Sequence, residues 1–306
     1  VRLDASQLQS PQRLRDIARK TRAIGARLLL EDGATPQSIP HGTGELRQAR
    51  PEACNTALPQ ARSEAARLLT KLEENHVEQI DMLIATHPHA DHIGGVNTLY
   101  RQCGNPDTQV YLPAADGLAD STFSAVPARA LRRCSHGDAL KILGLRVIVL
   151  DMPGHTAGHI AYFAERQSGL EQPFVLCGDT LFSAGCGRIF DGTPAQMYAS
   201  LQKLAALPDE TRVCCAHEYT LPNLHFAQAV EPGNAEIERH MKRCGALRAK
   251  NRPTLPSSLQ QEKAINPFLR VHEPAVRASA VAHDPSVSSP VEVFAALRAW
   301  KDHFSI

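Results

Sequence analysis

Three histidines and one aspartate lie within six residues of this chain, at His87, His89, Asp91 and His92. The mostly apolar run Ile80–Ala85 before them predicts a short buried strand, and the two glycines after them place the cluster in the loop at its end. In a loop, side chains at this spacing can converge on one point, which no regular helix or strand allows. Imidazole nitrogens and a carboxylate are ligands that Zn, Fe and Mn accept. The cluster therefore predicts a metal site, against the alternative of a polar loop with coincidental histidines.

Three later apolar runs are also followed by residues that bind metals. We predict strands at Leu145–Leu150, Phe174–Cys177 and Arg212–Ala216. These strands lead to His155, Asp179 and His217, respectively. A sheet whose strand ends line one edge would bring these side chains to the first cluster. The seven candidate ligands then form two sites and a bridge: His87, His89 and His155 for one ion, Asp91, His92 and His217 for the other, and Asp179 between them.

Two adjacent metal ions would supply the nucleophile of a hydrolase. Ions about 3.5–4 Å apart can share a bridging water, whose pKa falls toward about 7. We therefore predict a metal-bridging hydroxide, with Asp91 and Asp179 as the catalytic residues beside it. No acid outside the ligand set offers itself as a proton donor. This favours a thiolate leaving group, because a thiol has a pKa near about 8.5 and its thiolate departs unaided. His159 repeats the sequence context of His155, but neither site has room for it, so we predict a structural role.

Composition and charge argue against two classes of partner. The chain of 306 residues has a formal net charge of +1, which disfavours nucleic-acid binding through bulk electrostatics. No apolar run approaches the roughly 20 residues of a membrane-spanning helix, and residues 1–27 lack the apolar core of a secretory signal. The eight cysteines form no C-x-x-C pair, so we expect reduced thiols, with Cys177 and Cys186 buried, and a cytoplasmic protein.

The pattern of the chain changes twice. Residues 1–57 lack periodicity over most of their length, and we predict an atypical, poorly ordered start. Residues 1–220 as a whole form the predicted hydrolase domain, which carries every candidate metal ligand, and residues 221–306 form a helical, substrate-binding domain. In the latter we predict helices at Asn223–Val230, Ala235–Asn251 and Pro290–His303, and an extended apolar segment at Ile265–Arg270.

The candidate ligands resemble those of the metallo-β-lactamase superfamily. Residues His87–His92 match its H-x-H-x-D-H signature, and His155, Asp179 and His217 follow in the order that the superfamily shows. Within the superfamily, the chain is most similar to the bacterial glyoxalase II (hydroxyacylglutathione hydrolase) family. That similarity rests on six further segments: Cys177–Phe182, Ala184–Arg188, Ala216–Thr220, Leu247–Asn251, Asn266–Arg270 and Arg298–Asp302.

The resemblance implies an α/β fold, the αββα metallo-β-lactamase sandwich, with a C-terminal all-helical domain that completes the substrate site. It implies hydrolysis of S-D-lactoylglutathione to glutathione and D-lactate, the second step of methylglyoxal detoxification. It also implies two divalent metal ions per chain, with Zn expected first and Fe or Mn as alternatives. By matching positions, it assigns glutathione binding to Arg188, Tyr219, Arg298 and Lys301, with Phe190 lining the same site. We further expect a monomer that binds neither nucleic acid nor membranes.

The chemistry of the basic residues agrees with this assignment, because Arg and Lys bind carboxylates, of which glutathione has two, by charge-assisted hydrogen bonds. The alternative for Arg298 and Lys301, three residues apart on one helix, is a solvated charged face. Other functions remain open: another superfamily hydrolase, a persulfide dioxygenase with one iron, or an inactive metal-binding copy. The presence of both Asp91 and His217 favours two metals over one. The chain departs from the family in its start, which lacks the usual first strand pair, and in Pro88, which replaces a common histidine.

Overall fold

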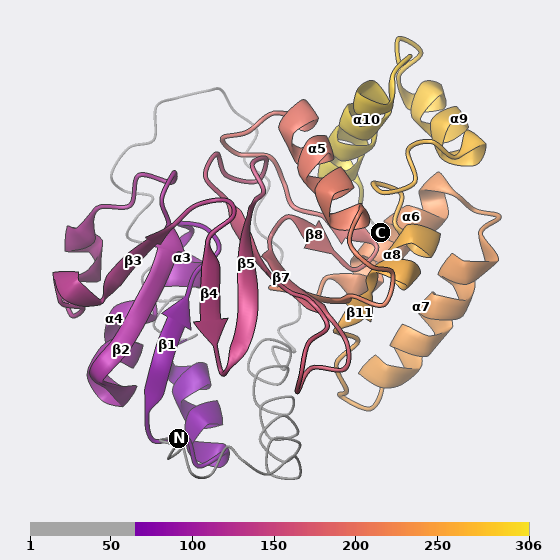
Figure 1. Ribbon diagram of the computed structural model, residues 1–306. Coiled ribbons are helices and arrows are strands. Elements are labelled where there is room, and N and C mark those ends of the chain that lie inside the picture. The colour runs from indigo at the N-terminus through magenta and orange to yellow at the C-terminus, as the bar shows by residue number, and fades with distance from the viewer. Residues whose placement is uncertain (1–64, 306) are drawn as a thin grey trace.

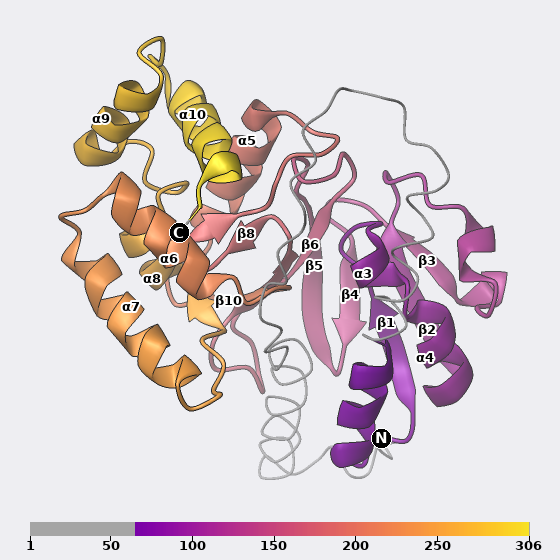
Figure 2. The same ribbon diagram turned by 180° about the vertical axis from the view of Figure 1, so that it is seen from behind.

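The computed structural model describes residues 65–305, so the irregular start predicted for residues 1–57 lies outside the described residues. A helix over residues 65–74 precedes two β-sheets that lie face to face between layers of helices (Figures 1 and 2). Within residues 65–305, no helix is both long enough and apolar enough to pass through a membrane.

The first sheet, as far as the chain is described, has parallel strands in the order β1-β2-β3. These are β1 (Ile80–Ile84), β2 (Gly104–Pro113) and β3 (Leu131–Cys134). Helix α4 (Val96–Cys103) connects β1 to β2 and packs on the outer face, near two 3₁₀ turns at Asp120–Phe123 and Ala128–Ala130 (Figure 1). The structure confirms the strand predicted before the histidine cluster, whereas the sequence did not indicate β3.

The second sheet has the strand order β11-β10-β7-β6-β5-β4. Its strands are β4 (Ala139–Ile142), β5 (Leu145–Asp151), β6 (Ile160–Ala164), β7 (Phe174–Gly178), β10 (Arg212–Cys215) and β11 (Ser257–Ser258). Strands β7 and β10 run parallel, and β6 runs antiparallel to both β5 and β7, so β5, β7 and β10 all end at the same edge. These are the three strands predicted to lead to metal ligands, and the structure confirms them. Strand β6 was not predicted.

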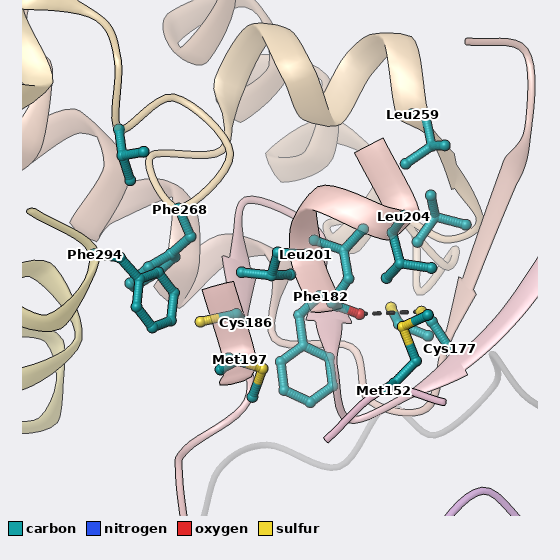
Figure 3. Close-up of a cluster of buried hydrophobic side chains, with 14 of the residues drawn as sticks. Met152, Cys177, Phe182, Cys186, Met197, Leu201, Leu204, Leu259, Phe268 and Phe294 are labelled. Atoms are coloured by element: carbon teal, nitrogen blue, oxygen red, sulfur yellow. Dashed lines mark hydrogen bonds between the residues drawn. The ribbon is translucent and has the colours of Figure 1, made fainter. Parts of the chain in front are cut away.

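Alternating side chains along β6 show how the layers are built. Tyr162 lies in the core between the two sheets, whereas its neighbour Phe163 lies in a second core on the outer face. Helix α5 (Pro194–Ala205) covers that outer face with Leu201, and Phe294 of the C-terminal helices joins the same core (Figure 3). The order of helix, sheet, sheet and helix confirms the predicted αββα sandwich.

The start of α5 is fixed by its own sequence and lies against the end of β5. Thr193 and Gln196 form a reciprocal capping box, in which each side chain accepts a hydrogen bond from the backbone N–H of the other. A Cβ atom at Gly154 would lie only 2.6 Å from the Cα atom of Met197 in this helix. The capped helix therefore supports the loop that carries His155.

The C-terminal region is helical, as predicted. Its helices are α6 (Thr220–Val230), α7 (Ala235–Arg248), α8 (Leu259–Ile265), α9 (Pro274–His283) and α10 (Pro290–His303). The extended segment predicted at Ile265–Arg270 was wrong, and α8 and α9 were not predicted. Ser258 caps the start of α8 by accepting a hydrogen bond from the N–H of Gln261, and the helix extends to Ile265. Asn266 Oδ1 then accepts a hydrogen bond from the N–H of Phe268 and closes a turn.

The helical region shares its core with the second sheet. Strand β11 of this region pairs with β10, and Leu259 and Phe268 pack in the core that covers the outer face of the sheet (Figure 3). A short hairpin, β8 (Leu181–Phe182) and β9 (Gly185–Cys186), lies in this core between the sheet and the helices. The sheet edge that carries the candidate ligands is thus continuous with the helical region.

Candidate metal centre

The first ligand cluster spans the end of β1 and a short helix. His87 follows β1, His89 is the N-cap residue of α3 (Ala90–Ile93), and Asp91 and His92 lie within α3. The prediction of a loop was therefore only partly right, because half of the cluster is helical. A buried hydrogen bond holds the chain just before the cluster: the Tyr162 hydroxyl of β6 donates to the carbonyl of Ala85 at 2.8 Å.

Three histidines form the first predicted ligand group. His89 Nδ1 lies 3.1 Å from His87 Nε2 and 3.0 Å from His155 Nε2. One nitrogen from each ring therefore faces a common point, and these nitrogens lie within 4.8 Å of one another. His87 and His155 are buried, so this ligand group lies mostly below the protein surface.

Asp91, His92 and His217 form the second predicted group. His217 Nε2 lies 3.3 Å from Asp91 Oδ2 and 3.3 Å from His92 Nε2. These three ligand atoms also lie within 4.8 Å of one another. The group is more exposed than the first, since Asp91 is open to solvent and the other two are half-buried.

Asp179 lies between the two groups, where a bridging ligand was predicted. Its Oδ1 is 3.2 Å from His92 Nε2, and its Oδ2 is 3.6 Å from both His155 Nε2 and His217 Nε2. One carboxylate thus faces ligand nitrogens of both groups. The structure brings all seven predicted ligands together from four strand ends.

The protonation states of the candidate ligands favour binding of divalent metal ions. Burial lowers the pKa of His87 far below its ordinary value and also lowers that of His155, so both imidazoles are neutral near pH 7. Burial acts to raise the pKa of Asp179, but the hydrogen bond and charge of His92, with the charge of His217, hold it far below its usual range. Neutral imidazoles and ionised carboxylates are the forms that bind divalent metals.

Further contacts orient these rings. His155 Nδ1 donates a 2.7 Å hydrogen bond to the carbonyl of Arg188, which leaves Nε2 free to face the ligand group. His159 is fully buried, and its Nε2 accepts a hydrogen bond from the N–H of Asp179 at 3.2 Å. Burial lowers the pKa of His159 to about 3. The predicted structural role of His159 is therefore confirmed by its contacts.

Two exposed aromatic rings flank the cluster. Phe190 is 60% exposed and lies edge-on to His89 and His155, with ring centroids 5.2 Å apart in each pair. Tyr219 is 45% exposed and stacks on His217 at 5.1 Å. Exposed aromatic surface beside a buried polar cluster is a common feature of ligand-binding sites.

Two of the three predicted basic residues, Arg188 and Arg298, meet around one carboxylate. Asp302 Oδ1 lies 3.4 Å from Arg188 Nε and 3.0 Å from Arg298 Nη2. Arg298 is only 7% exposed, and its Nη1 donates a 2.9 Å hydrogen bond to the carbonyl of Cys186. The alternative of a solvated charged face is therefore wrong for Arg298, whose guanidinium ties α10 to the loop that bears Arg188.

Lys301 is half-buried and lies one turn from Arg298. Its Nζ donates a 3.3 Å hydrogen bond to the carbonyl of Pro222 and lies 5.2 Å from the centre of the Phe226 ring. Burial, with a smaller effect of the Arg298 charge, lowers the pKa of Lys301 to about 8. This ammonium group therefore titrates close to the physiological range.

Sequence reasoning missed Asp116, which supports the His155 loop. Its Oδ1 accepts a 2.6 Å hydrogen bond from the N–H of Gly158, and its Oδ2 accepts one from the Thr156 hydroxyl at 3.3 Å. Asp116 lies in a loop some forty residues earlier in the chain, where no local pattern marks it. Only the folded structure shows the pairing.

Comparison with known proteins identifies the family. The model of the metallo-beta-lactamase superfamily matches residues 57–217, and that of the hydroxyacylglutathione hydrolase C-terminus matches residues 218–304. The hydroxyacylglutathione hydrolase of Albidiferax ferrireducens is 49% identical over 74% of this chain and 83% of its own length. This chain belongs to the hydroxyacylglutathione hydrolase family. Other hydroxyacylglutathione hydrolases agree: that of Cupriavidus taiwanensis is 50% identical over 72% of this chain and 82% of its own length, and that of Photobacterium profundum is 44% identical over 79% and 88%.

Proposed function

We propose that this chain hydrolyses S-D-lactoylglutathione, and 2-hydroxyacylglutathione thioesters in general, to glutathione and the free acid. With the lactoyl ester the acid is D-lactate, which makes the reaction the second step of methylglyoxal detoxification. One observation carries the proposal. All seven metal-ligand side chains gather beside exposed aromatic and basic residues, in a chain whose curated relatives are named hydroxyacylglutathione hydrolase.

We propose that the cluster holds two divalent metal ions. His87, His89 and His155 would hold one, Asp91, His92 and His217 the other, and Asp179 would bridge them. The donor set fits, because it combines buried neutral imidazoles with ionised carboxylates. When bound, such a pair polarises the carbonyl and makes hydroxide available near neutral pH. Zinc is our first expectation, with iron or manganese as alternatives, since all three accept mixed nitrogen and oxygen ligands.

The side chains at the rim would bind the glutathione part of the substrate. Arg188, whose side chain is 63% exposed, and Lys301 would pair with its carboxylates. Arg298 would add positive charge while its guanidinium holds the loop through Cys186. Phe190 and Tyr219 would line the site and exclude water from the thioester.

The two carboxylates of the cluster would act at the reacting atoms. Asp91 and Asp179 can accept hydrogen bonds from the attacking water and orient it toward the thioester carbonyl. The leaving thiolate needs no proton from the protein, because a thiol pKa of about 8.5 makes the thiolate a good leaving group, which takes up a proton from solvent after it departs. An ester or amide would need a proton donor at this point, so the cluster suits thioesters best.

The alternatives are less well supported. A persulfide dioxygenase with one iron would not need the second ligand group, which is complete here. An inactive copy would not be expected to keep every ligand in place. We also propose that the protein is a monomer and that it lies in the cytoplasm. The free state of all seven cysteines among residues 65–305 supports the location, because thiols stay reduced in that compartment.

A comparison of substrates on one metal-loaded preparation tests the function. S-D-lactoylglutathione, lactoyl-coenzyme A and a β-lactam would be assayed side by side. We expect turnover of the glutathione ester at a kcat/KM at least about 100-fold above the other two, since of the three substrates only this ester offers two carboxylates, for Arg188 and Lys301. Preferred hydrolysis of the β-lactam or the coenzyme A ester would contradict the proposal.

A further inference from the structure

The hairpin β8–β9 connects one candidate ligand to the hydrogen-bond partner of another. It begins two residues after Asp179 and leads through Gly187 to Arg188, whose carbonyl accepts the hydrogen bond from His155 Nδ1. A side chain at Gly187 would collide with the Asp179 carbonyl, so the two ends of the hairpin pack tightly against the cluster. Any shift of the hairpin would therefore move the partner of His155.

The tip of this hairpin is held by side chains of the helical region. Glu262 of α8 has no exposed surface, and its Oε2 accepts a 2.7 Å hydrogen bond from the N–H of Ala184. Ala184 has φ +57, a conformation that residues other than glycine rarely adopt and that the surroundings must hold in place. Asn266 Nδ2 donates to the carbonyls of Phe182 and Gly185, and also lies 3.3 Å from Glu262 Oε2.

The sides of the hairpin are fixed as well. Phe182 and Cys186 pack in the core that contains Leu259 and Phe268 of the helical region (Figure 3). Asn223 of α6 donates a 3.1 Å hydrogen bond to the carbonyl of Ser183. The hairpin thus has polar ties at its tip and apolar contacts along its length.

We propose that Glu262 is a positioning residue for the metal centre: through Ala184 it fixes the hairpin so that the Arg188 carbonyl orients His155. The same hairpin sets where the Arg188 side chain meets the substrate, and this second part rests on the proposed function. The first part does not, because it concerns the affinity of the His87–His89–His155 group for a metal ion.

Burial and hydrogen bonds act in opposite directions on the Glu262 carboxyl. Burial raises the pKa of the Glu262 carboxyl, while hydrogen bonds from Ser257, Ala184 and other neighbours act in the opposite direction. No cation pairs with this carboxyl among the described residues. Glutamine has the same shape and can accept the Ala184 hydrogen bond, so it should replace Glu262 with little effect.

Zinc competition against a chromophoric chelator tests the proposal on the full chain. We expect Glu262→Ala to weaken zinc affinity at one of two sites by at least about tenfold, the usual effect of losing a contact that orients a ligand. Glu262→Gln should stay within about threefold of the unaltered protein. Glu231→Ala is the matched control, because Glu231 is a largely buried carboxylate of the same region but pairs with Arg270, away from the hairpin.

The control separates positioning from stability. Glu231→Ala should lower the melting temperature and leave zinc affinity unchanged. Unaltered affinity in Glu262→Ala, or an equal loss in both variants, would overturn the proposal. If Glu262→Ala does not fold, Asn223→Ala, which removes one tie to the same hairpin, must show the tenfold loss, and wild-type affinity there would overturn it.

Thioester assays on the same samples separate the two proposals. We expect Glu262→Ala at saturating zinc to raise KM for S-D-lactoylglutathione several-fold, through the displaced Arg188 side chain. If the unaltered protein binds zinc with an affinity that depends on Glu262 but does not cleave the thioester, the proposed function fails while the positioning role stands.

Discussion

At Lys301, burial and substrate binding oppose each other. Burial lowers the pKa of this ammonium group to about 8, and Arg298, Arg188, Asp302 and Cys186 also face it. The unfolded chain binds this proton up to about pH 10.4, so between about pH 8 and 10.4 the contribution of Lys301 to stability rises with pH. Its capacity to pair with a carboxylate falls over the same range.

The lowered pKa of Lys301 predicts that kcat/KM for the glutathione thioester depends on pH. We expect kcat/KM for S-D-lactoylglutathione to fall as pH rises through about 8, because the free enzyme loses the charge on Lys301 Nζ. Lys301→Met should lower kcat/KM about tenfold at pH 7 and flatten this limb of the profile. Lys263→Met, which removes an exposed lysine paired with Asp209, is the control and should keep the unaltered profile. A full alkaline limb in Lys301→Met would exclude Lys301 as its source.

Asp179 permits a test of the bridging role. Asn is nearly the same size but has no charge, so Asp179→Asn should lose at least one bound metal ion and most of the turnover, by about 100-fold or more in kcat. Asp209→Asn, an exposed aspartate paired with Lys263, should behave like the unaltered chain. Metal analysis and kcat on the same samples check both. An Asp179→Asn protein with two metal ions and normal kcat would rule out the bridging role.

At the scale of elements, the sequence predicted the ligands because each follows directly after a strand. Local order in the chain was enough to place His155, Asp179 and His217 at one edge of the second sheet, and His87 just after β1 of the first sheet. It was not enough for the supports of these residues. Asp116 and Glu262 act on segments 42 and 78 residues away, and no short pattern marks such pairs.

Local sequence features explain why β3 was not predicted and why the prediction for residues 265–270 was wrong. Strand β3 contains two arginines in four residues, so its apolar signal is weak. The segment Ile265–Arg270 looked extended because it contains a proline and apolar residues. The Ser258 cap and the Asn266 turn decide its structure instead.

The contact between the His155 loop and α5 gives a prediction at this scale. Gly154 has φ +149, and a Cβ atom there would lie 2.6 Å from the Cα of Met197. Gly154→Ala should therefore displace the loop, lower stability by about 2 kcal/mol or more, and reduce kcat/KM. Gly169→Ala is the matched control, since Gly169 also has a positive φ (+84) but has open space around it. It should cost some stability and leave kcat/KM unchanged. Equal kinetics in both variants would contradict the role of the α5 contact.

At the scale of the whole molecule, one core joins the two segments matched by the family models. Val213 of β10, Leu201 of α5 and Phe294 of α10 belong to the same buried cluster. We therefore expect urea unfolding to be one transition, with coincident near- and far-ultraviolet circular dichroism. Two separated transitions would show that the segments fold independently.

A substitution in that shared core sharpens the test. Phe268 is fully buried, stacks near Phe226 and lies under the Arg298 guanidinium. Phe268→Ala should lower the free energy of unfolding by about 3–5 kcal/mol, and unfolding should remain a single transition. Val281→Ala, at an exposed position on α9, should change the free energy of unfolding by less than about 1 kcal/mol.

The central claim is that a seven-ligand centre for two divalent metal ions hydrolyses a glutathione thioester. The most direct measurement is turnover of S-D-lactoylglutathione while zinc is added back to the metal-free protein, with bound metal counted on the same samples. We predict that activity rises with loading and reaches its maximum only near two ions per chain. Full turnover in the metal-free protein, or no turnover of this ester with two ions bound, would contradict the claim.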